Sequence, residues 1–365
     1  MASSPGPIAA LSQQLDDFFS HQRRAIADFG PEAALLMDAA ADAIVGGKRL
    51  RARFCLTGYE AVAEVGTARA GEVPDAVAGV AAALEVFHAA ALVHDDLIDN
   101  SDTRRGRPAA HRRLERMHRE VSWDGDAAAF GRASGILLGD LLVALSDDLM
   151  ERSIAPLPAP IAAATRAQYA TMRRDVTIGQ FLDVAEESAH VEADDSEHAQ
   201  RALRVASLKS ARYSVEQPLL IGAQLAGADD EQLAALAAFG HPVGLAFQLR
   251  DDVLGVFGDA EVTGKPAGDD LREGKRTVLI AYAREALAPT ARRIVDELVG
   301  DPELDDVQVA ALRRTIEDSG ALERVETLIG EYVAAADRAL RGAPLGNTAV
   351  AHLRDLARDA AIRSA

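Results

Sequence analysis

Runs rich in alanine, with apolar residues at helical spacing, recur along most of the 365-residue chain. Alternating runs of β-branched residues, which indicate strands, are nearly absent. Alanine is the strongest helix former, and its small side chain lets neighbouring helices pack closely. Aromatic residues make up only 4% of the chain, so few bulky side chains keep the helices apart. The pattern predicts an all-α fold.

The helical pattern is interrupted in only a few places. Residues 103–130 are polar and irregular, and residues 258–276 are charged and rich in glycine, which is typical of a mobile lid. No internal repeat or linker divides the chain. We therefore expect a flexible N-terminal tail over residues 1–10 and a single helical domain over residues 11–365. Helices are expected at residues 11–45 with a break near Gly30-Pro31, and at 53–65, 75–100, 131–152, 161–185, 197–226, 230–257, 277–299, 306–317, 320–342 and 347–361.

The net charge of −18 restricts the possible partners of the chain. Binding to nucleic acid or to an anionic membrane needs an excess of Lys and Arg, so we expect neither. The only cysteine is Cys55, so no intramolecular disulfide can form. The apolar residues 77–93 are interrupted by Gly79, Glu85 and His88 and are short for a membrane span, so they predict a buried helix. The N-terminus shows no signal-peptide pattern, and we expect a cytoplasmic protein.

One acidic motif differs from the many other aspartate pairs of the chain. Asp95, Asp96 and Asp99 form the sequence DDLID at the end of an apolar helix. Asp95 and Asp99 are four residues apart and share one helix face, whereas Asp96 points about 100° away and is expected to support them. Two like charges on one face repel each other unless cations lie beside them. Oxygen ligands with open positions suit Mg²⁺ shared with a phosphate, so the motif predicts a magnesium site.

A second acidic cluster ends another apolar helix. Asp251 and Asp252 follow Gln248, Leu249 and Arg250. Such a pair alone is a weak signal for a metal site. Together, the two clusters predict carboxylates that face each other across a cavity and hold metal ions between them.

Basic residues lie beside both acidic clusters. Lys48 and Arg51 follow two glycines near the expected start of a helix, where backbone N–H groups also favour a phosphate. Arg104 and Arg105 follow the first acidic motif within two helical turns. An isolated cation is usually a solvated surface residue, but placement beside carboxylates indicates an anionic substrate such as a diphosphate. Further candidates are Lys209, Lys265 and Lys275.

In this order, the motifs resemble those of the trans-isoprenyl diphosphate synthases, also called the polyprenyl synthetase family, and are most like a bacterial geranylgeranyl diphosphate synthase. The resemblance covers most of the chain. It implies an all-α bundle around a deep central cavity, usually a homodimer, which uses three Mg²⁺ ions to join isopentenyl diphosphate head to tail to an allylic diphosphate. The matching segments are GGKRLR at 46–51, DDLIDNSDTRRG at 95–106, GQFLD at 179–183, LKSA at 208–211, FQLRDDVLGVFGD at 247–259 and VTGKPAGDDLREGKRT at 262–277.

The resemblance also implies roles for single residues. The metal ligands match Asp95, Asp99 and Asp251, with Asp96 and Asp252 beside them. The residues that bind isopentenyl diphosphate match Lys48, Arg51, His88 and Arg105. The residues that hold the allylic diphosphate match Arg104, Lys209, Lys265 and, on the lid, Lys275. Without the resemblance, His88 on an apolar helix would be interpreted as a core histidine.

The charges predict the chemistry. Metal ions, Arg and Lys draw charge onto the allylic diphosphate and make it a leaving group, after which the isopentenyl double bond attacks the allylic cation. The dipoles of Gln248 and the Ser210 hydroxyl, next to Lys209, are expected to stabilise this cation. The sequence shows no side-chain base near the site, so we expect the released diphosphate to take the proton. The cavity must exclude water, and the lid is expected to close it.

Three positions depart from the family pattern, of which Ala52, in place of the frequent proline after GGKRLR, is expected to matter little. Gly255 stands where the second motif usually ends in aspartate, so we expect Asp251 to carry the metal and Gly255→Asp to change activity only modestly. Ser210 replaces the usual threonine but keeps the hydroxyl.

Other classes of protein explain the motifs less well. A class I terpene cyclase handles one diphosphate and has no use for Lys48, Arg51, His88 and Arg105. A non-catalytic partner subunit would have lost one of the clusters, and only Gly255 points that way. A membrane aromatic prenyltransferase needs several spans, and a structural helical protein would not place basic residues beside each acidic cluster.

The helix that ends at Asp95 also predicts the product. Family members that stop at fifteen carbons typically carry bulky aromatic residues four and five positions before the first aspartate, where this chain has Ala91 and Ala90. Phe87, the next large side chain on that face, lies roughly 12 Å below Asp95 at about 1.5 Å rise per residue. One more isoprene unit then fits, which predicts the twenty-carbon geranylgeranyl diphosphate. If Phe87 is simply a core residue, the product reaches twenty-five carbons or more.

Overall fold

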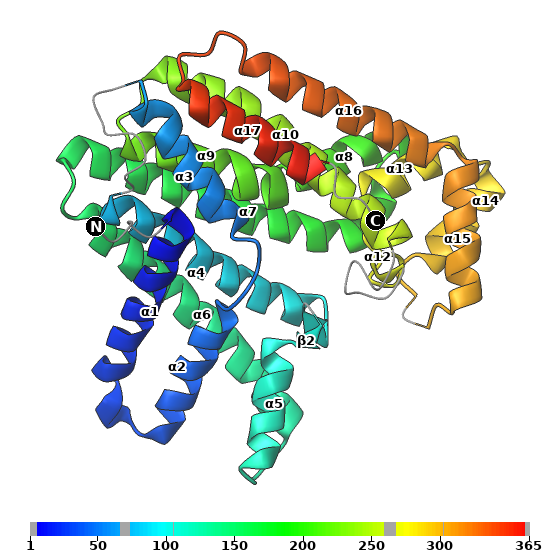
Figure 1. The fold of residues 1–365 in the computed structure, drawn as a ribbon. Coiled ribbons are helices and arrows are strands. Elements are labelled where there is room, and N and C mark those ends of the chain that lie inside the picture. The colour runs from blue at the N-terminus through cyan, green and yellow to red at the C-terminus, as the bar shows by residue number, and fades with distance from the viewer. Residues whose placement is uncertain (1–5, 66–73, 105, 259–267, 302, 362–365) are drawn as a thin grey trace.

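The computed structural model describes residues 6–65, 74–104, 106–258, 268–301 and 303–361, and this part of the chain is almost entirely helical (Figure 1). Its two short strands, β1 (Thr103–Arg104) and β2 (Arg107–Pro108), form one antiparallel pair. The predicted all-α fold is confirmed. The helical elements in chain order are α1 (Pro7–Ala25), η1 (Ala27–Phe29), α2 (Pro31–Ala43), α3 (Leu50–Ala63), α4 (Asp75–Ile98), α5 (Ala110–Glu120), α6 (Ala127–Ile154), α7 (Ala159–Ala189), η2 (His190–Glu192), η3 (Asp195–Glu197), α8 (His198–Val205), η4 (Ala206–Glu216), α9 (Gln217–Leu225), α10 (Asp230–Phe257), α12 (Asp269–Arg272), α13 (Val278–Ala286), α14 (Pro289–Leu298), α15 (Asp306–Asp318), α16 (Ala321–Ala339) and α17 (Asn347–Ala361).

Helix α4 lies inside the largest core cluster and carries the first acidic motif at its end. Nearly all of its side chains between Val77 and Ala90 are buried, and it packs against α6, α1 and α3. Apolar residues on every face are typical of a helix surrounded by protein. By length and composition, α4 and α6 are each apolar enough to cross a membrane, but 78% of the apolar window of α4 is buried within the fold. The sequence therefore correctly predicted a buried helix over residues 77–93.

Two glycines let α3 and α9 approach each other closely. A Cβ atom on Gly222 of α9 would collide with the carbonyl oxygen of Cys55, and one on Gly58 of α3 would collide with that of Leu219. This contact fixes the start of α3 beside η4, which leads directly into α9. Two parts of the predicted site, the residues near Lys48 and those near Lys209, are thereby brought together.

The structure departs from the predicted elements in several places. Helix α1 begins at Pro7, inside the predicted tail, because its apolar side chains from Leu11 onward are buried. Helix α5 lies in the stretch predicted to be irregular. Residues 206–216 form a π-helix within the single helix predicted over 197–226, and residues 277–299 form two helices, α13 and α14. Of the predicted lid, residues 259–267 lie outside the described residues.

Candidate active site

The first acidic cluster lies at the C-terminal end of α4, where the helix dipole is negative and needs cations beside it. The β1–β2 turn brings back Arg104, whose Nε donates to Oδ1 of Asp96 at 2.7 Å. Its Nη2 also donates to Oδ2 of Asp95 at 3.2 Å. Asp96 is buried, and burial raises its pKa despite the contact with Arg104. Asp96 thus anchors Arg104, as expected of a supporting residue.

Lys209 reaches the same cluster from the π-helix η4. Its Nζ donates to Oδ2 of Asp183 at 2.6 Å and lies 3.5 Å from Oδ1 of Asp95. Gln180 of α7 donates to the same Asp95 oxygen at 3.3 Å. Burial raises the pKa of Asp95, but Lys209 and Arg104 outweigh it, so the net shift is downward. Asp95 is therefore held ionised. Asp183 and Gln180 belong to the GQFLD segment and were not predicted as site residues.

Lys275 links the two halves of the site. Its Nζ lies 3.6 Å from Oδ2 of Asp99, 3.7 Å from Oδ1 of Asp270 and 2.5 Å from Oε2 of Glu273. Burial and the neighbouring Asp95 raise the pKa of Asp99 to about 6. Asp270 and Glu273 belong to the GDDLREGK part of the lid motif, where spacing alone did not distinguish them from solvated acids.

The second acidic cluster lies on the last two turns of α10. Nε2 of Gln248 donates to Oδ1 of Asp252 at 2.6 Å, which leaves the amide oxygen of Gln248 as an acceptor. Burial, together with Asp270 and Asp251, raises the pKa of Asp252 to about 8. Asp251, the predicted ligand, is only partly buried. Burial is the largest cause of this rise in pKa, and the neighbouring carboxylates add to it.

Gly255 faces the lid rather than open space. A Cβ atom on Gly255 would collide with Oδ2 of Asp270, a residue of α12. The carboxylate of Asp270 thus occupies the space into which a side chain at position 255 would project. Gly255→Asp therefore requires the Asp270 carboxylate to shift, and the expectation that it changes activity only modestly stays a prediction.

The site has the ligand chemistry that Mg²⁺ prefers. Its candidate ligands are carboxylate oxygens at the ends of α4 and α10, with no thiolate or imidazole among them. Within the described ranges, no three His, Cys, Asp or Glu side chains converge into a preformed metal site. Instead Arg104, Lys209 and Lys275 lie against the first cluster. The residues present therefore fit Mg²⁺ that binds together with an anionic substrate.

Of the residues expected to bind isopentenyl diphosphate, the structure brings Arg51 and His88 close together but shows no contact between them and Lys48. Lys48 is exposed in the loop before α3. Arg51 donates to Oγ of Ser214 at 2.7 Å, and its guanidinium carbon lies 4.2 Å from the ring centre of Tyr213. The Tyr213 hydroxyl lies 3.3 Å from Nδ1 of His88. Tyr213 thus joins Arg51 to His88, a role that no sequence motif indicated.

Glu85 is a buried acid on the apolar face of α4. Its Oε1 accepts a hydrogen bond from the backbone N–H of Ala52 in the first turn of α3, at 3.1 Å. Oε2 lies 3.6 Å from the Arg49 guanidinium. Arg49 has a left-handed backbone conformation with φ of 51°, so the turn before α3 is tightly specified. Glu85 therefore fixes the loop that carries Lys48 and the first turn of α3, which carries Arg51.

The predicted chain-length residues lie one to two turns below the aspartates. Ala91 is partly exposed and Ala90 is buried. Phe87 packs edge to face against Tyr169 of α7 and Tyr213 of η4, with ring centres 6.2 and 5.9 Å apart. Three aromatic rings from three elements therefore meet at this depth.

Arg105, Lys265 and Ser210 complete the set of predicted site residues. Arg105 and Lys265 lie outside the described residues. Ser210 lies on η4, next to Lys209, and is partly buried.

Comparison with known proteins decides the family. The family model described as polyprenyl synthetase matches residues 34–316. The chain belongs to the polyprenyl synthetase family. The crystal structure of geranylgeranyl pyrophosphate synthase from Corynebacterium glutamicum, complexed with isoprenyl diphosphate and magnesium, is 36% identical, with a TM-score of 0.90 over 98% of both chains. The short chain isoprenyl diphosphate synthase of Methanothermobacter thermautotrophicus is 31% identical over 85% of both chains. Component 2 of the heptaprenyl diphosphate synthase of Geobacillus stearothermophilus is 32% identical over 96% of this chain and 93% of its own.

Membership in the polyprenyl synthetase family confirms that this chain is a prenyltransferase. The terpene cyclase alternative finds no support in these relatives, each of which is named as a prenyl diphosphate synthase or a component of one. Their names cover short and long products, so family membership does not fix the product length.

Proposed function

We propose that the chain is a Mg²⁺-dependent synthase that joins isopentenyl diphosphate to allylic diphosphates and ends at geranylgeranyl diphosphate. The observation that carries the reaction is the pairing of opposite charges between the two acidic clusters. Lys275 lies between Asp99 of the first cluster and Asp270, which packs against Gly255 beside the second. A diphosphate with its metal ions can replace these internal ion pairs without leaving any charge uncompensated.

In this proposal, Asp95, Asp99 and Asp251 hold Mg²⁺, which supplies positive charge to the leaving diphosphate. Arg104 and Lys209 donate to the diphosphate oxygens, supported by Asp96 and Asp183. Lys275 and Lys265 act from the lid. Lys48, Arg51, His88 and Arg105 hold isopentenyl diphosphate on the other side.

The groups around the reacting carbon orient the substrate and stabilise charge. The amide oxygen of Gln248 is oriented by the hydrogen bond from its Nε2 to Asp252, and it presents a negative dipole to the allylic cation. The hydroxyl of Ser210 acts in the same way. The released diphosphate takes the proton, so no side-chain base is required.

The test of the reaction is incubation with labelled isopentenyl diphosphate, Mg²⁺ and each allylic primer in turn. Labelled polyprenyl diphosphate is expected in Mg²⁺ and none in excess EDTA. Full turnover in EDTA would refute the metal requirement. Absence of product with every primer would favour the partner-subunit alternative.

The proposed product length rests on Phe87. Its ring, packed between Tyr169 and Tyr213, closes the space beneath Ala91 about two helical turns from Asp95. A tail of twenty carbons ends there. Chain-length analysis of the labelled products distinguishes this outcome from fifteen carbons and from twenty-five or more.

We also propose a cytoplasmic homodimer that buries α6 and α7. Five large apolar side chains on these two helices are exposed in the single chain: Ile136, Leu137, Ile178, Phe181 and Val184. Exposed apolar groups gathered on neighbouring elements are typical of an interface.

A further inference from the structure

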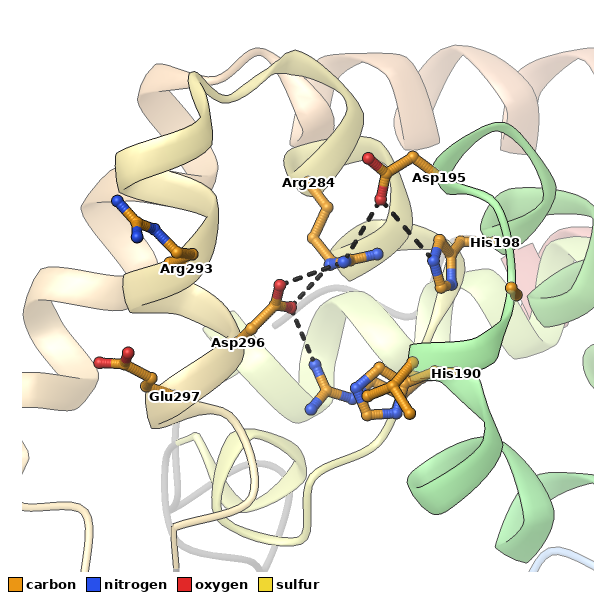
Figure 2. A pocket seen from close by; sticks show the side chains of 10 residues that line it. His190, Asp195, His198, Arg284, Arg293, Asp296 and Glu297 are labelled. Atoms are coloured by element: carbon orange, nitrogen blue, oxygen red, sulfur yellow. Dashed lines mark hydrogen bonds and ion pairs between the residues drawn. The ribbon is translucent and has the colours of Figure 1, made fainter.

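A charged cavity lies beyond the lid motif, outside the proposed active site (Figure 2). It encloses about 490 Å³ between the segment from η2 to α8 on one side and α13 with α14 on the other. Its lining includes His190, Asp195, His198, Arg276, Arg284 and Asp296. None of the carboxylates of the two aspartate clusters faces it.

The cavity lining carries three arginines and three acids, and Arg292, which is outside the lining, adds a fourth guanidinium to the ion-pair network. Arg284 donates to both oxygens of Asp296, at 2.7 and 3.1 Å, and also lies 3.5 Å from Asp195. Asp195 is shared with Arg292, and Asp296 is shared with Arg276. Three guanidinium groups thus share two carboxylates. Arg293 and Glu297 are exposed on one face of α14 and offset each other.

The guanidinium N–H donors of Arg276 are incompletely satisfied. Its two hydrogen bonds are long, 3.4 Å to Asp296 and 3.3 Å to the carbonyl of Val299, and its Nε is buried without an acceptor. Its side chain is only 12% exposed, so water does not satisfy these donors well. Two histidines of the lining lie close to these arginines. Burial and Arg276 lower the pKa of His190, and burial and Arg284 lower that of His198.

We propose that this cavity binds a phosphate or diphosphate anion at a site separate from the active site. Guanidinium groups match the geometry of these oxyanions, and the buried Nε of Arg276, which has no acceptor, favours a ligand that carries acceptor oxygens. Arg276 directly follows Lys275, whose Nζ lies against Asp99. An anion that draws Arg276 toward the cavity therefore pulls on the backbone of the lid lysine.

The test is a titration in EDTA, with histidine rings observed by NMR after ¹³C labelling. His190→Gln and His198→Gln assign the two signals. Inorganic phosphate, inorganic diphosphate and isopentenyl diphosphate are added in separate titrations, which distinguish a free anion from a prenyl headgroup. Both signals should shift with saturation, and the pKa of His190 should rise as the anion offsets the positive charge.

Arg284→Gln should weaken this binding about tenfold or more, since charge-assisted hydrogen bonds are lost. Arg276→Gln is the second variant, used if circular dichroism shows that the first is misfolded. Arg324→Gln is the matched control, because Arg324 pairs with Glu285 on the exposed surface.

Unmoved His190 and His198 signals in the unmodified protein, or equal shifts in both cavity variants, would overturn the proposal. Because the titration is done without metal or turnover, its failure leaves the proposed reaction untouched.

Discussion

At the scale of single residues, turnover is expected to be most sensitive to substitutions in the first acidic cluster. Asp95 and Asp99 are four residues apart on α4, and each lies near a different lysine. We expect Asp95→Ala and Asp99→Ala each to lower turnover on the order of a hundredfold or more, because each removes a metal ligand. Steady-state kinetics and Mg²⁺ titration calorimetry measure the two effects. Asp148→Ala, at an exposed acid on α6, is the control, and an active Asp99→Ala would contradict the assignment.

Gly255 gives a second prediction at this scale. Gly255→Ala should destabilise the fold by about 1–3 kcal/mol, because the added methyl group is forced against Asp270. Gly255→Asp should do so as well. Urea unfolding measures the effect. Gly330→Ala is the control, since no atom lies within 4 Å of its Cβ position on α16. Equal stability of both alanine variants would show that Asp270 moves aside freely.

The site residues that could be predicted from the sequence are those that belong to a recognisable sequence motif. Asp95, Arg104, Lys209 and Lys275 were predicted and lie together in the fold. Glu85 and Tyr213 were missed because their contacts join residues far apart in sequence. A lone Glu within an apolar run was a usable signal for Glu85, since burial requires a partner. The sequence held no such signal for Tyr213, because a single tyrosine is not distinguishable from other residues of a hydrophobic core.

At the scale of elements, α4 couples to α3 through one side chain. Glu85→Ala leaves the N–H of Ala52 unsatisfied, so the loop with Lys48 and the first turn of α3 with Arg51 should loosen. We expect the KM for isopentenyl diphosphate to rise about tenfold, with little change in the KM for the allylic substrate. Glu85→Gln keeps an acceptor and should restore most of the loss. A rise confined to the allylic KM would contradict this role.

The depth of the cavity is also a property of elements, because α4, α7 and η4 each contribute one ring. Phe87→Ala should lengthen the product beyond twenty carbons, and Ala91→Phe should shorten it toward fifteen. Val86→Ala is the matched control on α4, since Val86 is buried one position away and points elsewhere. Chromatography of dephosphorylated products gives the lengths. An unchanged distribution for Phe87→Ala would remove the basis of the twenty-carbon proposal.

Element prediction failed where polar residues carry the packing. Helix α5 has the sequence AHRRLERMHRE and buries His111, Glu115 and His118, with Arg112 and Arg119 paired to Glu115. The helix lacks the apolar run that identified the others, although its polar and apolar residues lie on opposite faces, and that periodicity was the signal that could have found it. By contrast, α4 and α10 were predicted within two residues of their ends, since their apolar runs begin and stop sharply.

At the scale of the whole molecule, the apolar face of α6 and α7 predicts self-association. Leu137→Asp and Phe181→Asp should convert a dimer to a monomer, because each places a charge in a buried apolar interface. Light scattering after size-exclusion chromatography gives the mass. Phe29→Asp is the control, since Phe29 is 72% exposed on η1, away from both helices. A dimer that survives both interface variants would place the contact elsewhere.

The π-helix η4 has a consequence for how related sequences compare. Its eleven residues, from Ala206 to Glu216, hold more residues per turn than an α-helix does. Deleting one of them would let the segment relax toward α-helical geometry, and its side chains would then face different directions relative to α4. Lys209 and Tyr213 would then no longer face Asp95 and His88 at the same time. Side-chain substitutions leave this register intact. A related sequence with a one-residue deletion in this segment is expected to lack the site.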